Sequence, residues 1–254
     1  MSERYDTIGV NYSDLRKPDP RIAALIEVAL GSAKTVLNVG AGTGSYEPAG
    51  RQTTAVEPSF TMIRQRTAPA VAVIQGCAED LPFADDSFDA AMAVLTIHHW
   101  SDQAKGCAEL RRVTRGPIAL LTYDPAVRGF WLADYLPGLV SLDEAQMPPM
   151  ARYEQWLGPV EITPVPIPSD CTDGFLCAYW RRPAAYLDPR IRSAISSFWA
   201  LGDISRELAK LERDISTGVW AKRYAELWKR DQLDLGYRLV VTKSNASCAE
   251  PAVH

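Results

Sequence analysis

Three glycines stand at alternate positions of one short segment, Gly40-Ala41-Gly42-Thr43-Gly44, directly after the apolar run 35–39. Glycine lets the backbone approach a ligand closely at positions where a side chain would collide with it. The dinucleotide-binding fingerprint is Gly-x-Gly-x-x-Gly, but here the third glycine comes one residue early and Ser45 holds its place. The spacing therefore indicates a nucleotide-like ligand and disfavours a nicotinamide dinucleotide.

One acidic residue, Glu57, ends the next β-rich run, residues 53–57. A carboxylate at this point can accept hydrogen bonds from both hydroxyls of a ribose, a bidentate contact that fixes an adenosine. Taken alone, the glycine segment is equally consistent with a tight strand-to-helix turn, and Glu57 with a solvated glutamate. Because strand, glycine segment and acid occur in the order that a nucleoside site needs, we predict such a site here.

The pair His98-His99 follows a long apolar run, residues 88–95. Imidazole titrates near neutrality, which suits the deprotonation of a phenol, an amine or an acidic carbon. His99 is therefore our candidate for a catalytic general base. Such a base is needed only if the attacking group carries a proton, so a packing and hydrogen-bonding role for His99 is the alternative.

These residues need a scaffold, and the first half of the chain has a regular one. We expect strands at 35–39, 53–57, 71–74, 88–95 and 117–123, and helices at 21–30, 59–66 and 103–113. Strands that alternate with helices at this interval predict an α/β fold with a doubly wound parallel sheet covered on both faces. Ligands of such sheets bind at the carboxyl ends of the strands, where the glycine segment, Glu57 and His99 all fall.

The second half is less regular. Helical patterns occupy 190–201, 206–215 and 219–232, and strands are expected at 160–167 and 236–242. We expect residues 126–158, which contain several aromatic residues and prolines, to form a helical insertion that caps a substrate. Trp131 and Tyr135 within it are our candidates to line an apolar acceptor pocket, although aromatic residues at helical spacing are commonly core residues.

Composition excludes several classes of protein. The chain has 254 residues, of which 47% are hydrophobic and 23% charged, with a net charge of −4; this excludes wholesale disorder and disfavours a nucleic-acid partner. The five cysteines form no Cys-x-x-Cys pair, so we predict no metal site and no disulfide framework, and a reducing, cytoplasmic location. We find no secretory signal and no apolar run near the roughly 20 residues that span a bilayer, so no membrane partner is expected.

Four segments carry a family resemblance: VLNVGAGTGSY, AVEPSFTM, GCAEDLPFADDSFDAAMAVLTIHHW and ELRRVTRGPIALLTYDP. Together they resemble the class I S-adenosylmethionine-dependent methyltransferases, and more narrowly the type 11 group that includes the ubiquinone and menaquinone methyltransferases. The resemblance covers about residues 1–125. It implies a seven-stranded Rossmann-like sheet whose last strand, near 236–242, is antiparallel. It also implies S-adenosylmethionine as the cofactor and S-adenosylhomocysteine as its product.

The resemblance assigns roles to single residues. The glycine loop would hold the methionine moiety, Glu57 the ribose, and the residues after the third strand the adenine. Leu95 and Thr96 would face the sulfonium, and the guanidinium of Arg16 would suit the methionine carboxylate. The cofactor-binding residues implied in this way are Tyr12, Arg16, Gly40, Ala41, Gly42, Gly44, Glu57, Pro58, Met62, Ala78, Glu79, Leu95 and Thr96.

Two positions depart from the family pattern, which usually has aspartate where this chain has Asn38 and often aspartate where it has Cys77. Asn38 cannot neutralise the methionine ammonium, and Cys77 accepts only weakly from the adenine amine. We interpret both as changes in cofactor affinity within an intact fold.

We therefore predict a single methyltransferase domain over 1–254. Within it, 1–125 form the cofactor-binding core, 126–158 the cap, 159–243 the remaining strands and helices, and 244–254 a tail. The expected reaction is methylation of a small organic acceptor of secondary metabolism. The alternatives are a related enzyme with cyclase or lyase chemistry at the sulfonium, and a cofactor-binding regulatory module without catalysis.

Overall fold

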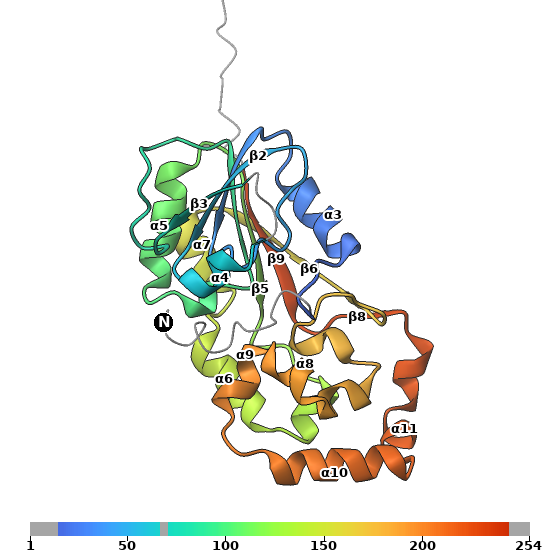
Figure 1. Cartoon of the computed structure of the whole chain (residues 1–254). Coiled ribbons are helices and arrows are strands. Elements are labelled where there is room, and N and C mark those ends of the chain that lie inside the picture. The colour runs from blue at the N-terminus through green and yellow to red at the C-terminus, as the bar shows by residue number, and fades with distance from the viewer. Residues whose placement is uncertain (1–14, 67–70, 244–254) are drawn as a thin grey trace, which may run out of the picture.

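The centre of the molecule is a twisted seven-stranded sheet, seen in a computed structural model that describes residues 15–66 and 71–243 (Figure 1). The strands lie in the order β3-β2-β1-β4-β5-β9-β6. Their bounds are β1 (Thr35–Val39), β2 (Gln52–Glu57), β3 (Ala72–Gln75), β4 (Ala90–Val94), β5 (Ile118–Tyr123), β6 (Val160–Pro164) and β9 (Tyr237–Thr242). Strands β1 to β5 pair in parallel, whereas β9 pairs antiparallel with both β5 and β6. The predicted doubly wound sheet with an antiparallel last strand is confirmed.

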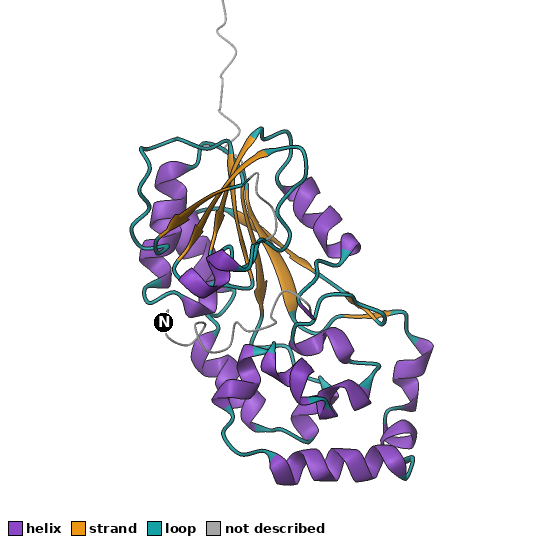
Figure 2. Cartoon of the chain, in the orientation of Figure 1, coloured by secondary structure: helices purple, strands orange, loops and turns teal. Residues whose placement is uncertain are grey.

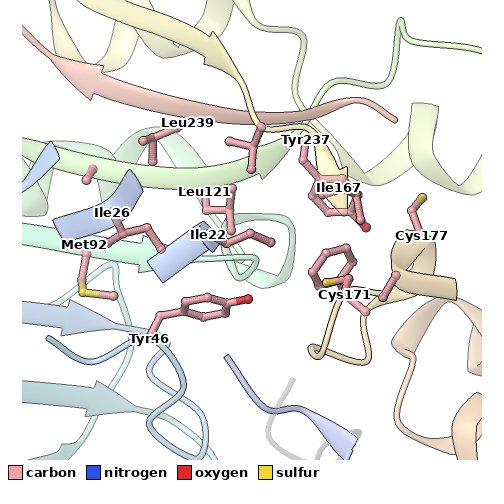
Figure 3. Close-up of a cluster of buried hydrophobic side chains, with 14 of the residues drawn as sticks. Ile22, Ile26, Tyr46, Met92, Leu121, Ile167, Cys171, Cys177, Tyr237 and Leu239 are labelled. Atoms are coloured by element: carbon pink, nitrogen blue, oxygen red, sulfur yellow. The ribbon is translucent and has the colours of Figure 1, made fainter. Parts of the chain in front are cut away.

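Helices cover both faces of this sheet (Figure 2). Helix α3 (Pro20–Ala29) packs on one face, and α5 (Gln103–Val113) and α7 (Ala151–Leu157) pack on the other. Successive residues of the central strands alternate between the two cores, as a pleated strand requires: Met92 belongs to the α3 side, and its neighbours Ala91 and Ala93 to the α5 side. Figure 3 shows the α3-side cluster, in which Ile22 and Ile26 meet side chains of the sheet. Two buried faces explain why these strands read as nearly continuous apolar runs.

A helical lobe lies beyond the carboxyl ends of the parallel strands (Figure 1). It comprises η2 (Trp131–Asp134), α6 (Gly138–Gln146), η3 (Leu176–Tyr179), η4 (Pro183–Leu187), α8 (Pro189–Ser193), α9 (Ser196–Ala200), α10 (Ser205–Ser216), α11 (Val219–Arg223) and η5 (Ala225–Lys229). A separate aromatic-rich core holds it together, centred on the buried Trp131, Tyr186 and Trp220. The lobe is thus drawn from two stretches of sequence, one after β5 and one before β9.

This arrangement corrects the boundaries of the predicted cap. Helix α7 lies within the predicted 126–158 insertion, but its Tyr153 and Leu157 are buried in the core between α5 and the sheet. Most of the lobe comes from residues after 170, which the sequence pattern did not connect with a cap. The physical reason is that helix α7 has an apolar face that matches α5, so it covers the sheet instead of the site.

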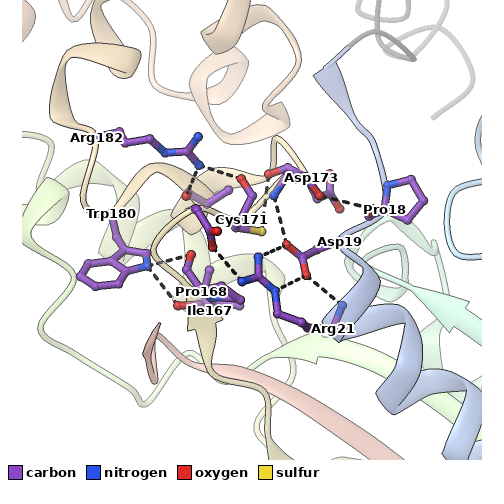
Figure 4. A network of polar contacts seen from close by, with 12 residues as sticks. Pro18, Asp19, Arg21, Ile167, Pro168, Cys171, Asp173, Trp180 and Arg182 are labelled. Atoms are coloured by element: carbon purple, nitrogen blue, oxygen red, sulfur yellow. Dashed lines mark hydrogen bonds and ion pairs between the residues drawn. The ribbon is translucent and has the colours of Figure 1, made fainter. Parts of the chain in front are cut away.

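A polar network ties the chain entering α3 to the loop before η3 (Figure 4). Asp19 caps α3 by accepting from the Arg21 backbone N–H, and it also accepts from the Thr172 N–H across the network. Burial alone raises the pKa of Asp19, but these hydrogen bonds and the Arg21 guanidinium lower it to about 2. The two-stranded ribbon of β7 (Ile167–Pro168) and β8 (Gln232–Leu233) connects the same region to the end of the lobe.

One short helix completes the framework. Helix α4 (Phe60–Arg64) begins after Ser59, whose hydroxyl accepts from the Met62 N–H. No helix among residues 15–66 and 71–243 is long and apolar enough to cross a membrane.

Candidate functional site

A pocket of about 530 Å³, called here the first pocket, opens at the carboxyl ends of β1 to β4. Of the predicted cofactor-binding residues, those that line it are Arg16, Gly40, Ala41, Gly42, Glu57, Pro58, Met62, Ala78, Glu79, Leu95 and Thr96. His99 also lines it. Gly44 does not, and Tyr12 lies outside the described residues.

The glycine loop forms one wall and needs its glycines for two different reasons. Gly40 has φ of +67°, and a Cβ there would lie 2.0 Å from Thr96 Oγ1, so the loop presses directly against the end of β4. Gly42 has φ of +53°, and a Cβ there would meet no atom within 4 Å. The backbone at Gly42 therefore borders open space, which is the form of a cradle that a ligand can fill.

Glu57 is held in place by the backbone on either side of it. One carboxylate oxygen accepts from the Gly42 N–H at 2.7 Å and the other from the Ser59 N–H at 2.9 Å, and only 6% of the residue is exposed. Burial raises the pKa of Glu57, while these two hydrogen bonds and Arg66 oppose the rise. Each oxygen retains a lone pair for a further donor, so the carboxylate can receive two hydroxyls of a ribose without moving.

A buried ion pair lies behind the glycine loop and accounts for Asn38. The Arg66 guanidinium contacts both oxygens of Glu47, at 2.5 and 2.6 Å, and donates to the Gly42 carbonyl oxygen. Asn38 Nδ2 donates to the same Glu47 carboxylate at 3.1 Å. An aspartate at 38 would set a second carboxylate against Glu47, so the amide fits this arrangement. A Cβ at Gly44 would lie 3.0 Å from Glu47 Oε2, which places Gly44 against this pair and not on the pocket surface.

Glu79 braces the wall of the pocket that follows β3. Its carboxylate oxygen accepts from the Ser101 and Asp102 backbone N–H groups and from the Ser101 hydroxyl, at 2.6 to 3.0 Å. Burial raises the pKa of Glu79, but these hydrogen bonds lower it below its usual value. The buried Ala78 and Met62 supply apolar surface suited to a flat ring, and Cys77 lines the same side.

The end of β4 is strained where it reaches the pocket. Leu95 has φ of +51°, a conformation that L-residues other than Asn and Asp rarely adopt. Thr96 then begins the 3-10 turn η1 (Ile97–His99), which turns the two histidines toward the lobe. Strain of this kind persists where surrounding structure enforces it, often at ligand sites.

Arg16 lines the pocket and is held in place by a residue that is distant in the sequence. Its Nε donates to Asp173 Oδ1 at 2.6 Å, and the buried Tyr46 hydroxyl donates to the other oxygen of Asp173 at 2.9 Å. Burial, followed by the Asp173 charge, raises the pKa of Tyr46 far above its usual value, so Tyr46 remains a neutral donor. Arg16 is thereby fixed between the sheet and the loop before η3.

A second pocket lies between the sheet and the helical lobe. It shares Arg16, Leu95 and His99 with the first pocket. Its other lining residues are His98, Tyr123, Asp143, Met147, Phe175, Leu176, Ile195, Ser196, Ser197 and Tyr237. Burial and the Arg16 charge lower the pKa of His98 to about 4, so this imidazole is neutral near pH 7, with its ring 3.9 Å from that of His99.

Trp131 and Tyr135 lie in neither pocket, which corrects their predicted place on the acceptor surface. Trp131 is 3% exposed and donates from Nε1 to the Trp180 carbonyl oxygen, with its ring edge-on to that of Trp220. The Tyr135 hydroxyl donates to Asp214 on α10. Both side chains turn into the core of the lobe because helices from residues 183–224 pack against them there.

Several pocket residues were missed because their signals are weak in the sequence. Ser45, Tyr46, Ser59, Gln75, Gly76 and Trp100 line the first pocket. All but Gln75 fall within the four segments that carry the family resemblance, so including every residue of these segments would have found them. Asp143 and Tyr237 in the second pocket follow no motif, and no signal in the sequence connects them.

Comparison with known proteins agrees with this geometry. A family model described as a methyltransferase domain matches residues 37–117. The demethylmenaquinone methyltransferase of Thermobifida fusca is 34% identical over 126 residues, which are 45% of this chain and 53% of that protein. The corresponding enzyme of Renibacterium salmoninarum is 38% identical over 86 residues, 32% of this chain and 36% of that one. The chain thus aligns with between about a third and a half of the length of these curated relatives.

One solved structure matches nearly the whole chain. It is a protein of Anabaena variabilis ATCC 29413, assigned as a methyltransferase of an antibiotic biosynthesis pathway. It is 35% identical, with a TM-score of 0.84 over 90% of this chain and 99% of that one. The cofactor of this fold family is S-adenosylmethionine, and the open cradle at Gly42 and the preset Glu57 carboxylate fit it. The chain belongs to the class I S-adenosylmethionine-dependent methyltransferases of the type 11 group.

Proposed function

We propose that this protein transfers the methyl group of S-adenosylmethionine to a small, largely apolar organic acceptor bound between His99 and the helical lobe. The observation that carries the proposal is the continuity of the two pockets, which share Arg16, Leu95 and His99. The first pocket has the volume for the cofactor, and the second, a cavity of about 70 Å³, adjoins it on the side where an acceptor would lie. When bound, the cofactor supplies an electrophilic methyl group on a sulfonium and leaves as S-adenosylhomocysteine.

The residues of this chain hold the two reactants and exclude water. Glu57 would receive the ribose hydroxyls, the Gly42 backbone would border the methionine moiety, and Ala78 and Met62 would contact the adenine. Arg16, fixed by Asp173, would face the methionine carboxylate. Alignment of the nucleophile with the methyl group and exclusion of water are the main contributions that such a reaction needs.

The class of acceptor is a small molecule, and we place the reaction in secondary metabolism. The similarity over 90% of the chain to the Anabaena protein, assigned to an antibiotic biosynthesis pathway, supports this context. The partial match to demethylmenaquinone methyltransferases makes quinols a second group to include among test acceptors.

The direct test is mass spectrometry of reactions that contain the protein, S-adenosylmethionine with a trideuterated methyl group, and fractions of small molecules. We expect a product heavier by one trideuteromethyl group in place of one hydrogen, together with S-adenosylhomocysteine. At a cofactor concentration that half-saturates the unmodified protein, the Glu57→Ala variant should form much less of both, because its affinity for the cofactor is lower. Consumption of cofactor without a labelled product would favour the cyclase or lyase alternative, and cofactor binding without consumption would favour a regulatory module.

His99 is the proposed proton acceptor at the junction of the pockets. His99→Asn should lower turnover on the identified acceptor about 10²-fold, with cofactor affinity unchanged. A small loss of turnover accompanied by reduced stability would instead assign His99 to packing. Unchanged turnover would remove it from the mechanism and leave catalysis to positioning.

A further inference from the structure

The second pocket contains one charged side chain that the proposed function does not use, Asp143. It stands on α6 one turn before Met147, so both side chains lie on the same face of the helix and line the pocket. Among residues 15–66 and 71–243, no hydrogen bond or ion pair to the Asp143 carboxylate is found. Its sequence neighbour Glu144, in contrast, is exposed and paired with Arg128 at 2.5 Å.

The other groups in the second pocket do not neutralise this carboxylate. Among the described residues that line this pocket, Arg16 carries the one guanidinium or ammonium group, and its Nε donates to Asp173. His98 is held neutral by burial. The remaining walls are the His99 imidazole, hydroxyl groups, apolar side chains and the rings of Tyr123, Phe175 and Tyr237. The Arg128 charge acts on Asp143 from outside the lining, but Arg128 is itself paired with Glu144. Within the lining, Asp143 is the one carboxylate among the described residues.

The three rings are packed against one another. The Tyr123 and Tyr237 rings lie edge-on with centroids 5.5 Å apart, and Phe175 lies 4.6 Å from Tyr237. Asp143 is half-buried, and a carboxylate removed in part from water is destabilised unless it is paired or loses its charge. Desolvation raises the pKa of Asp143 to about 6, so near pH 7 it is charged and lacks a partner. A carboxylate beside aromatic rings is the surrounding that a protonated amine prefers, through charge pairing and cation–π contact.

We propose that the acceptor is an amine and that the Asp143 carboxylate pairs with its ammonium or N–H group in the second pocket. This rests on the proposed function, because it names the acceptor class of the same site. Asp143 acts here as a specificity-determining residue. It orients the nitrogen toward the junction of the pockets formed by Arg16, Leu95 and His99.

The test uses cofactor analogues that bind in the first pocket and extend an arm into the second. These are nitrogen analogues of S-adenosylmethionine, in which nitrogen replaces the sulfur and carries an arm of two to four carbons. The arm ends in an amine, a hydroxyl or a methyl group. Their dissociation constants are measured by calorimetry on the full chain, with S-adenosylhomocysteine as the reference ligand.

We expect the best amine arm to bind about tenfold or more tightly than the methyl-ended arm of the same length, as a charged hydrogen bond in a desolvated site should. Asp143→Asn should abolish this advantage and leave S-adenosylhomocysteine binding unchanged. Glu144→Gln, which removes the same charge one residue away on an exposed surface, should preserve it.

The other outcomes are distinct. If amine and methyl arms bind equally at every length, Asp143 does not recognise an amine and the inference fails. If hydroxyl arms match amine arms, the carboxylate selects a neutral donor, which overturns the amine assignment. If neither S-adenosylhomocysteine nor any analogue binds, the proposed function itself fails. Thermal unfolding of both variants establishes that they fold.

Discussion

The first and second pockets meet at three residues but draw on very different parts of the chain. Apart from Arg16, the first pocket is lined by residues 38–101, from loops that follow successive strands of the sheet. The second takes its lining from seven separate stretches of sequence, from Arg16 to Tyr237. The first pocket is thus formed by local backbone turns, whereas the second depends on side chains that only the packed lobe brings together.

Different interactions stabilise the first pocket and the helical lobe. In the first pocket, backbone N–H groups fix Glu57 and Glu79, and glycines set the shape of the loop. In the lobe, interlocking aromatic rings set the shape. The first pocket should therefore tolerate damage to the lobe, and the following changes test that independence.

The largest expected effect is on the lobe alone. Trp131→Ala removes a fully packed indole and its hydrogen bond to Trp180, and should lower the free energy of unfolding by about 3–5 kcal/mol. The affinity for S-adenosylhomocysteine should stay unchanged, because Trp131 lines neither pocket. Urea unfolding and calorimetry measure the two quantities, with the half-exposed Trp199→Ala as the control. A parallel loss of ligand affinity would show that the two regions form one unit.

Gly40→Ala should be nearly as damaging, but to the first pocket. The new Cβ would overlap Thr96 in addition to its unfavourable φ, at a combined cost of about 3 kcal/mol in stability. Affinity for S-adenosylhomocysteine should fall with it. Gly50→Ala is the matched control, since Gly50 has φ of +79° but a Cβ there meets no atom within 4 Å. Equal effects of the two variants would mean that conformation, and not contact with β4, explains Gly40.

Glu57→Ala should reduce affinity for S-adenosylhomocysteine by about 2–3 kcal/mol, through loss of charge-assisted hydrogen bonds to the ribose. Calorimetry on both proteins gives the difference. Glu212→Ala, an exposed change on α10, should have no effect. Equal affinity of the Glu57→Ala variant and the unmodified protein would contradict the ribose assignment.

The smallest effect should be a gain in stability. Burial raises the pKa of Asp143 from its usual 3.8 to about 6, so the folded protein prefers the neutral acid. The carboxylate therefore destabilises the fold above about pH 6. The shift corresponds to at most about 3 kcal/mol, and partial exposure of the side chain reduces this to about 1–2 kcal/mol.

Asp143→Asn should accordingly be more stable than the unmodified protein by about 1–2 kcal/mol at pH 8, and the gain should fade as the pH falls from about 6 to 4. Urea unfolding of both proteins at several pH values gives the difference between their free energies of unfolding. The contribution from titration of His98 is the same in both proteins and cancels in this difference. Glu144→Gln should change stability by less than about 0.5 kcal/mol. A loss of stability in Asp143→Asn at pH 8 would show that the carboxylate has a stabilising partner, against the picture of an unpaired charge.

The sequence by itself determined the sheet and most of the first pocket. Residues 35–39, 53–57 and 103–113 read as strand, strand and helix, and the structure agrees within a residue. The glycine segment and Glu57 were recognisable because their spacing follows directly from a strand-to-helix turn, a geometry fixed by a few consecutive residues. The strands are recognisable as short apolar runs because both of their faces are buried, and the helices by their apolar residues at helical spacing.

Only the tertiary structure decided which aromatic side chains face the core and which face a ligand. Trp131 and Tyr123 are both large aromatic residues after β4, yet Trp131 is enclosed by Trp220 and Tyr186 while Tyr123 lines the second pocket. The pairing of Arg16 with Asp173 spans 157 positions, and no local pattern predicts it. In the sequence, Asp143 is likewise an ordinary helix residue, and only the packing of the lobe against the sheet places it in the second pocket. Such placements depend on which surfaces pack together, and that is set by the sum of contacts over the whole chain.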